Sequence, residues 1–212
     1  MRISVFGASG GIGTEVVRQS LAAGDEVIAV LRTAASLAVE PSDRLTVMRA
    51  QVTDPKAIAP AVEATDSVVS ALGPRRRDVV RICSQGTASV ITAMRSVGVQ
   101  RLLVVSAGGA FIDEGDDFFS RTIIKPLIVQ RLFRDGFVDL RVMEGEVRAS
   151  GLNWTIVRPP RLLNRPHTGR YRTAVDRNVK GGYQISRADV ADAIRRALKD
   201  PATIGHTIGV AY

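Results

Sequence analysis

Short apolar runs separated by amphipathic segments recur along this chain of 212 residues. The first two apolar runs, 2–6 and 26–31, flank a segment, 12–23, whose apolar residues recur at helical spacing. Gly24 follows that segment as a helix C-terminal cap, and Gly98 stands in the same position before a later apolar run. Strands that are almost wholly apolar and alternate with helices predict an α/β fold with a doubly wound, mostly parallel sheet.

The rest of the chain continues this alternation, with one exception. Apolar runs at 45–49 and 67–72 predict further strands, and TIGVAY predicts a closing strand. Ser186 is a suitable N-cap for a last helix, with Asp189 three residues later. The exception is 160–184, which is rich in Arg, Pro and Gly and lacks a clear period. We expect it to form a small substrate-capping region at the carboxyl ends of the strands.

The composition describes an ordinary globular protein with a single domain, residues 1–212. Hydrophobic residues make up 45% and charged residues 24%, and no uncharged apolar run is long enough to span a membrane. A strand pattern occupies the N-terminus in place of a signal peptide, so we expect a cytoplasmic protein. The single cysteine, Cys83, excludes an internal disulfide and is expected to be a small buried side chain. With only two histidines, no metal site is expected.

The formal net charge of +8 raises the question of nucleic-acid binding. The arginines are scattered, however, and only 75–77 form a run, with no aromatic stacking pair among them. We therefore expect no nucleic-acid partner, and a site for a small anionic ligand instead.

The segment GASGGIG, residues 7–13, directly follows the first apolar run and opens the first helix. In a dinucleotide-binding loop, Gly7 permits a tight turn, Gly10 leaves room for a diphosphate, and Gly13 lets the helix pack closely. Strand, glycines and helix in this order are the context that the motif requires. The segment predicts a Rossmann-like dinucleotide site.

An arginine, Arg32, ends the second apolar run, where loops that prefer NAD usually carry an acidic residue for the ribose hydroxyls. A guanidinium cannot accept a hydrogen bond from a hydroxyl, but it suits a 2′-phosphate. The cofactor is therefore predicted to be NADP(H). The alternative is that Arg32 only ends the strand in solvent.

The ends of later strands are expected to supply further cofactor contacts. Gln51 and Val52 follow the third strand, where proteins of this kind hold the adenine. Residues 71–73 end the fourth strand and are placed to pass under the cofactor ribose. Arg75 either supports the cofactor phosphates or belongs to a solvated helix start.

Five segments fall in one order along the whole chain: GASGGIG, SALGPRRRDVV, VITAMRSVGVQRLLVVSAGGAF, RASGLNWTIVRPP and RPHTGRY. In these segments the sequence resembles the atypical short-chain dehydrogenases/reductases with an NAD(P)-binding Rossmann domain. More narrowly, it is similar to the NADPH-dependent flavin reductase/biliverdin-IXβ reductase group and to NmrA-like proteins. The glycine loop is specific to the superfamily, and the paired prolines and HTGRY are specific to the narrower group.

This resemblance implies that the nicotinamide lies over the ends of strands four to six. Ser106 and Ala107, at the end of the fifth strand, would lie near it, and Ser106 would polarise the carboxamide or an acceptor oxygen. Pro159 and Pro160 would border it, although they could also only stop the strand. Phe111 would begin a loop that covers the substrate.

The chain departs from the wider superfamily in its proton donor. The positions of the Tyr-x-x-x-Lys motif hold Phe137 and Arg141, and phenylalanine has no proton to give. The flavin and biliverdin reductase group also manages without that tyrosine, because hydride can pass to a stacked flavin while solvent supplies the proton. His167 is a candidate donor, or else an exposed loop histidine. The family's Gly-Asp after strand three is Ala50-Gln51 here, which weakens the adenine prediction at Gln51.

These considerations define the predicted site. Ser106 and His167 are the predicted catalytic residues. Glu144 and Glu146 are expected to be exposed helix charges, with a cleft-facing Glu144 as the alternative, and Trp154 is expected in the core. The predicted cofactor contacts are Gly7, Ser9, Gly10, Gly11, Ile12, Gly13, Arg32, Gln51, Val52, Ala71, Leu72, Gly73, Arg75, Ser106, Ala107, Pro159 and Pro160.

The sequence as a whole predicts an NADPH-dependent reductase that acts on a flat conjugated small molecule such as a flavin or a quinone. We expect a monomer or homodimer without a membrane partner. Two alternatives stay open. One is a non-catalytic NADP-binding regulator of the NmrA kind, and the other is a biosynthetic ketoreductase or isomerase with a specialised substrate.

Overall fold

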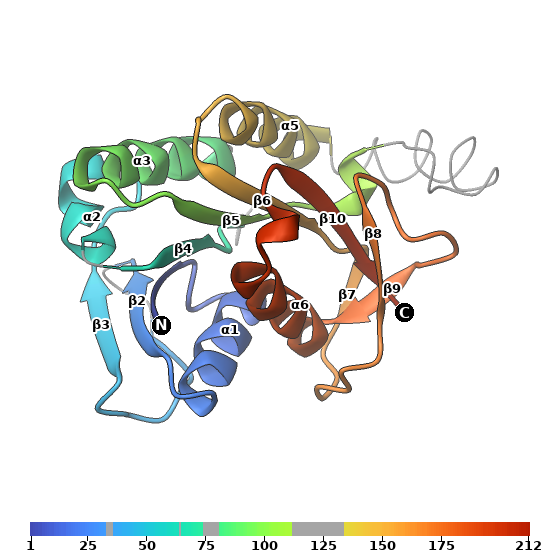
Figure 1. The fold of residues 1–212 in the computed structure, drawn as a ribbon, viewed down its shortest axis with the longest axis horizontal. Coiled ribbons are helices and arrows are strands. Elements are labelled where there is room, and N and C mark those ends of the chain that lie inside the picture. Colours follow the sequence, from blue (N-terminus) through green and yellow to red (C-terminus); the bar gives the residue numbers. More distant parts are fainter. Residues whose placement is uncertain (33–35, 64, 74–80, 112–133) are drawn as a thin grey trace.

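Eight strands form the central sheet of the computed structural model, in the spatial order β3-β2-β1-β4-β5-β6-β10-β8 (Figure 1). All neighbouring strands are parallel except β10 and β8, which are antiparallel. The strands are β1 (Arg2–Phe6), β2 (Glu26–Leu31), β3 (Leu45–Arg49), β4 (Ser67–Ser70), β5 (Arg101–Val105), β6 (Asn153–Arg158), β8 (Arg172–Val175) and β10 (His206–Ala211). The predicted doubly wound, mostly parallel sheet is confirmed, and its strand order reverses between β1 and β4.

The structure describes residues 1–32, 36–63, 65–73, 81–111 and 134–212. Among the helices in these ranges, none combines the length and the apolar composition that a membrane span requires.

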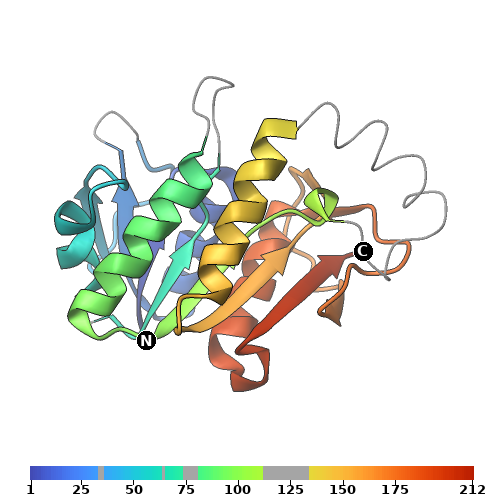
Figure 2. The ribbon, with the colours of Figure 1, turned by 90° about the horizontal axis from the view of Figure 1, so that it is seen from above.

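Helices cover both faces of the sheet (Figure 2). They are α1 (Gly11–Ala22), α2 (Pro55–Val62), α3 (Ile82–Val97), α5 (Arg134–Arg148) and α6 (Arg187–Lys199), with 3₁₀ turns η1 (Gly108–Ala110) and η3 (Pro201–Thr203). Side chains alternate between the two faces along each strand. In β1, Ile3 and Val5 pack with α1 and α6, whereas Phe6 packs with α2, α3 and α5. The near-continuous apolar runs of the sequence therefore reflect two cores that share one sheet.

The glycine caps predicted from the sequence are confirmed. Gly24 and Gly98 follow α1 and α3 with φ angles of +83° and +80°, a conformation that residues with a side chain rarely adopt. The fourth strand ends at Ser70, two residues before the end of the predicted run at 67–72. The segment 71–73 therefore leaves the sheet as a loop.

The stretch 160–184 is more regular than its sequence indicated. Its first residues form β7 (Arg161–Leu163), which pairs in parallel with β9 (Gln184–Ser186) in a separate two-stranded sheet. Its middle forms β8, at the edge of the main sheet. Most side chains of β8 are exposed, so no alternation of apolar and polar residues revealed this strand in the sequence.

Asp189, in the first turn of α6, ties the loop before β8 to that helix. Its buried carboxylate accepts hydrogen bonds from the amides of Thr168 and Gly169, both at 2.8 Å, and from the Tyr212 hydroxyl at 2.6 Å. Ser186 caps the helix as predicted, and its Oγ accepts from the Asp189 amide at 2.9 Å. Burial alone would raise the pKa of Asp189, but the hydrogen bonds from Tyr212, Thr168 and Gly169 outweigh burial and lower the pKa to about 2.

We predict that Asp189→Asn lowers the free energy of unfolding by about 2 kcal/mol at neutral pH, because the folded state favours the ionised carboxylate. A depressed pKa stabilises the fold above the ordinary value of 3.8, and this contribution disappears as the pH falls from there through about 2. Chemical denaturation at several pH values measures the effect. Glu26→Gln is the control, since that carboxylate is 65% exposed and its loss should change stability by less than about 0.5 kcal/mol. A deficit of the same size at pH 2 and pH 7 would contradict the electrostatic explanation.

Candidate functional site

The glycine turn after β1 is packed so closely that two of its glycines have no room for a side chain. Gly7 has a φ of +75°, and a Cβ on it would lie 2.4 Å from the Ala71 carbonyl oxygen. A Cβ on Gly13 would lie 2.2 Å from the Gly7 carbonyl oxygen. The tight turn predicted at Gly7 and the close helix packing predicted at Gly13 are therefore confirmed.

Helix α1 starts from this turn with its first amides facing a cavity. The Gly10 amide donates to the Gly7 carbonyl at 2.8 Å, and Gly10 is the N-cap residue but supplies no side-chain cap. The first amides of an α-helix have no acceptor within the helix and carry partial positive charge. Because Gly10, Gly11 and Ile12 also line the cavity, the helix start is suited to an anion.

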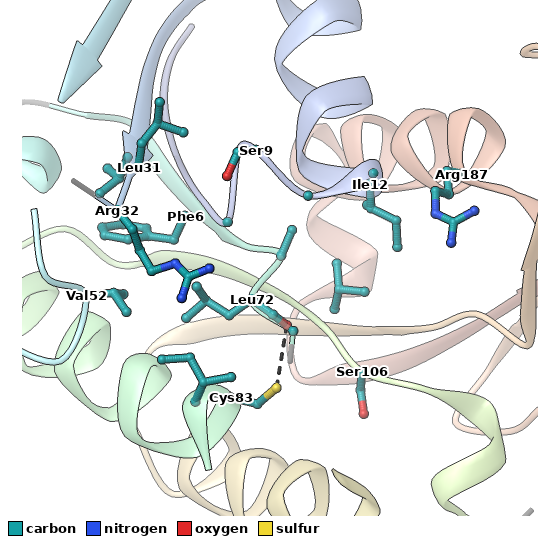
Figure 3. A pocket seen from close by; sticks show the side chains of 18 of the residues that line it. Phe6, Ser9, Ile12, Leu31, Arg32, Val52, Leu72, Cys83, Ser106 and Arg187 are labelled. Atoms are coloured by element: carbon teal, nitrogen blue, oxygen red, sulfur yellow. Dashed lines mark hydrogen bonds between the residues drawn. The ribbon is translucent and has the colours of Figure 1, made fainter. Parts of the chain in front are cut away.

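The cavity has a volume of about 600 Å³ and lies where the strand order reverses (Figure 3). This is the place where doubly wound sheets bind ligands, and the volume lies within the range of small-molecule sites. The lining residues are Phe6, Gly7, Ser9, Gly10, Gly11, Ile12, Val30, Leu31, Arg32, Ala50, Val52, Ala71, Leu72, Gly73, Ile82, Cys83, Val105, Ser106, Leu140, Leu162 and Arg187.

Most of the predicted cofactor contacts meet at this cavity. They are Gly7, Ser9, Gly10, Gly11, Ile12, Arg32, Val52, Ala71, Leu72, Gly73 and Ser106. The predicted contacts that are not part of the lining are Gly13, Gln51, Ala107, Pro159 and Pro160. Arg75 lies outside the described residues.

The residues outside the lining have other neighbours. The exposed Gln51 donates from Nε2 to the Thr53 hydroxyl at 3.1 Å. Pro159 is buried, and its carbonyl accepts from the Gly108 amide at 2.9 Å. Pro159 therefore holds the loop after β5 against the end of β6, and the cofactor role predicted for both prolines stays a prediction.

His167, in the loop before β8, lies beside α6 and does not line the cavity. Its Nε2 is 3.7 Å from a carboxylate oxygen of Asp192 and 3.9 Å from one of Asp189, and its side chain is 49% exposed. Asp192 also accepts from the Tyr171 hydroxyl at 2.7 Å. In this position the histidine belongs to the contacts that attach the HTGRY segment to α6. Its role as a proton donor stays a prediction.

Ser106, at the end of β5, does line the cavity. Its amide donates to the Val157 carbonyl at 2.9 Å, which fixes the backbone in the sheet. The residue is only 6% exposed, yet its hydroxyl has no hydrogen-bond partner within the described part of the chain. A few other buried polar atoms of the described residues also lack a partner, but none of them lines this cavity.

Cys83 lines the cavity near the start of α3 but is not suited to nucleophilic chemistry. The side chain is buried and donates weakly from Sγ to the Leu72 carbonyl at 3.6 Å. Burial, followed by the charge of Asp139 and its hydrogen bond, raises the pKa of the Cys83 thiol to about 12. The same carboxylate accepts from the amides of Cys83 and Ser84 at 2.9 and 3.1 Å, so α5 supplies the N-terminal cap of α3. The predicted buried role of Cys83 is confirmed.

Glu144 is not an exposed helix charge, as the sequence had suggested, but is fully buried. Arg158 donates to its two carboxylate oxygens, from Nε at 2.9 Å and from Nη2 at 2.6 Å. Arg148 adds a contact at 2.9 Å from the same helix, and Phe111 lies over Arg158 with its ring centroid 3.6 Å from Cζ. The expectation of exposure was wrong because an arginine from β6, invisible to helical spacing, neutralises this carboxylate.

Two other expectations need adjustment. Glu146 is half-buried, and within the described residues its Oε2 has no hydrogen-bond partner. Burial, with a contribution from the charge of Asp139, raises the pKa of Glu146. Trp154 is half-buried and packs at the margin of the core on the α3–α5 face.

Several lining residues were not among the predicted contacts, and three of these come from the C-terminal half of the chain. Leu140 comes from α5, Leu162 from β7 and Arg187 from α6. The predicted N-cap at Ser186 was a usable signal for Arg187, since it placed the start of a helix close to the carboxyl edge of the sheet. Leu140 and Leu162 had no such local signal.

Comparisons with known proteins agree with this site. The profile of a family described as NAD(P)H-binding matches residues 7–201. The chain is 31% identical to the UPF0659 protein YMR090W of Saccharomyces cerevisiae over 225 aligned residues, covering 99% of this chain and 92% of that protein. It is 27% identical to the uncharacterized sugar epimerase YhfK of Bacillus subtilis, covering 96% of this chain and 90% of that one.

Solved structures share the fold. A short-chain dehydrogenase/reductase of Veillonella parvula in complex with NADP superposes with a TM-score of 0.79 at 22% identity, over 100% of this chain and 94% of that chain. A Streptococcus pneumoniae protein provisionally named an NADH-flavin reductase superposes with a TM-score of 0.81 at 24% identity, over 100% and 99% of the two chains.

We predict that Gly7→Ala destabilises the protein more than Gly98→Ala. Both glycines have a positive φ, but a Cβ on Gly98 has no atom within 4 Å, whereas one on Gly7 meets the Ala71 carbonyl. Gly98→Ala should therefore cost about 1–2 kcal/mol for the left-handed backbone alone. Gly7→Ala should cost at least about 1 kcal/mol more, because backbone must move. Thermal or chemical unfolding measures both, and equal losses would show that the turn can relax away from β4.

Proposed function

Because this chain belongs to the NAD(P)H-binding family, we propose that it is an NADPH-dependent reductase that transfers a hydride to a flat conjugated acceptor. Flavins and quinones are acceptors of this type. The observation that carries the proposal is the buried residue Ser106, which lines the cavity and whose hydroxyl has no partner among the described residues. Buried hydroxyls are normally hydrogen bonded, so this one indicates a ligand that supplies the missing partner.

The residues at the cavity fit a nicotinamide dinucleotide. The amides at the start of α1 would hold the diphosphate, and Ser106 would donate to an oxygen of the carboxamide or of the acceptor. When bound, a reduced nicotinamide supplies the hydride. The protein would contribute by positioning the cofactor, since the glycine turn would hold the diphosphate and the end of β5 would hold the nicotinamide end.

Arg32 supports NADPH over NADH. It directly follows β2, is exposed, and lines the cavity. A guanidinium has no lone pair to accept from the ribose hydroxyls, but it can donate to a 2′-phosphate. Within the described residues, no Asp or Glu lines the cavity to accept from those hydroxyls instead.

The surroundings of Ser106 support an acceptor that needs no acid from the protein. Val105, Leu140 and Leu162 give the cavity an apolar surface on which a flat ring can pack. Phe137 carries no proton, and Arg141 uses its Nε to donate to the Ala110 carbonyl at 3.0 Å. A flavin or quinone fits these conditions, since its second step is a protonation that solvent can perform. The name of the Streptococcus pneumoniae structure points the same way.

The alternative is a regulator that binds NADP(H) without turnover. Phe137 and Arg141 favour it, because the proton donor and the cationic partner of the wider superfamily are replaced by groups that do not line the cavity. Incubation of the pure protein with NADPH and a panel of flavins and quinones separates the two. Loss of reduced-nicotinamide absorbance with an acceptor supports the reductase, and tight NADPH binding with no oxidation by any acceptor supports the regulator.

We predict that Ser106→Ala lowers kcat about 10- to 100-fold while the Kd for NADPH changes less than about threefold. The hydroxyl is expected to act on the reacting end of the cofactor, while the diphosphate contacts stay intact. Steady-state kinetics and titration calorimetry provide the two values. Ser96→Ala is the control, because its exposed side chain on α3 bonds only the Ala93 carbonyl among the described residues. Unchanged kcat in Ser106→Ala would remove this serine from the mechanism.

We predict that Arg32→Asp weakens NADPH binding about 10- to 100-fold and leaves NADH binding equal or stronger. The carboxylate repels a 2′-phosphate but accepts hydrogen bonds from ribose hydroxyls. Calorimetric Kd values for both nucleotides give the ratio. Arg170→Asp, an exposed charge reversal outside the cavity lining, controls for net charge. An unchanged NADPH/NADH preference in Arg32→Asp would contradict the selector role.

A further inference from the structure

Among the described residues, the charged side chains that line the cavity are two cations. They are Arg32, after β2, and Arg187, the first residue of α6, and no described carboxylate shares the lining with them. Figure 3 shows the two arginines on opposite sides of the turn that carries Ser9 and Ile12. The partial positive charge of the α1 N-terminus lies between them. A cavity of this charge is complementary to a ligand that carries anionic groups at two separate places.

Arg187 reaches the cavity because Gly11 has no side chain. A Cβ on Gly11 would lie 2.5 Å from Cδ and 2.7 Å from Nε of Arg187. The third-nearest atom, at 3.7 Å, is Cζ of the same arginine. The dinucleotide-binding motif explains Gly7, Gly10 and Gly13 but not Gly11. The structure explains Gly11, since the absence of a side chain there leaves space for the aliphatic part of Arg187 from the last helix.

The position of Arg187 is electrostatically unfavourable without a ligand. A cation in the first turn of α6 opposes the helix dipole, and the adjacent start of α1 is also positive. Arg187 makes no ion pair with any described carboxylate, although it is half-buried. Asn164, after β7, accepts from its Nη1 and orients the guanidinium. By contrast, the buried Arg158 is neutralised by Glu144.

We propose that Arg187 is a binding residue for the diphosphate of the dinucleotide, on which it acts opposite the amides of α1. An anion there would accept hydrogen bonds from the helix amides on one side and from the guanidinium on the other. Its negative charge would relieve the repulsion between the guanidinium and the positive end of α1. The identity of the ligand rests on the proposed function, but the assignment of Arg187 rests on the geometry of Gly11 and on the charge of the cavity. Arg32 and Arg187 then have separate roles, because only the first distinguishes NADPH from NADH.

Titration calorimetry of the full chain with NADPH, NADH and adenosine 2′-monophosphate tests this assignment. Arg187→Gln should weaken both dinucleotides by the same factor, about 10- to 100-fold, because both contain the diphosphate. Binding of adenosine 2′-monophosphate should not change, since this probe lacks the diphosphate. Arg161→Gln, an exposed arginine of β7 outside the cavity lining, is the matched control and should leave all three Kd values unchanged.

A double-mutant cycle with Gly11 provides the second measurement. Gly11→Ala should weaken NADPH about 10-fold in the native background, because the new Cβ displaces the Arg187 side chain. In the Arg187→Ala background the same change should weaken NADPH less than about threefold, since the side-chain atoms nearest to the new Cβ are gone. Thermal melting of each variant confirms that it is folded.

The outcomes separate this assignment from the proposed function. If the native protein binds NADPH and Arg187→Gln binds both dinucleotides as tightly, the assignment is overturned while the proposed function stands. A rise in the KM for the acceptor with unchanged dinucleotide Kd values would also overturn it, because Arg187 would then contact the acceptor. If the native protein binds no nicotinamide dinucleotide, both fail together.

Discussion

The close approach of Gly7 to the Ala71 carbonyl is the contact on which the site depends. Strands β1 and β4 stay paired up to Phe6 and Ser70, and the next residues touch without space for a Cβ. Beyond this contact the chains separate, because α1 leaves on one face and the loop from Ala71 leads toward α3 on the other. The cavity lies at this point of separation, and the glycines Gly7, Gly10 and Gly11 in its lining leave space for a ligand to approach the backbone.

Much of the fold, and the part of the site formed by the ends of β1, β2 and β4, could be predicted from the sequence because the sequence patterns that indicate them are local. A strand that is buried on both faces reads as an apolar run, and a glycine with a positive φ marks the end of a helix. The turn at Gly7 and the placement of Arg32 follow from the same strand and helix order. Once the sheet is doubly wound, the carboxyl ends of β1, β2 and β4 must share one edge, so these residues meet.

The other half of the site depends on contacts between distant segments, which spacing does not reveal. From the sequence, Glu144 is expected to be a surface charge of α5. In the fold, Arg158 of β6 donates hydrogen bonds to its carboxylate. From the sequence, Arg187 is only a polar residue at the start of a helix. In the fold, α6 packs beside α1, and Gly11 leaves room there for the Arg187 side chain. In each case the decisive neighbour is a side chain whose direction is fixed only by tertiary packing, and propensity carries no information about it.

Helix α5 carries Phe137 and Arg141 where the wider superfamily that the sequence resembles has a tyrosine and a lysine. Here its polar side chains act on protein groups: Glu144 neutralises Arg158 at the end of β6, and Arg141 donates to the Ala110 carbonyl after β5. Breaking a buried pair of this kind typically costs several kcal/mol, so the ends of β5 and β6 are held firmly. The helix thus stabilises the ends of these two strands, one of which leads into Ser106. In the reductase that we propose, hydride transfer on this surface would depend on orientation, so an acceptor that solvent can protonate would match this architecture better than a ketone.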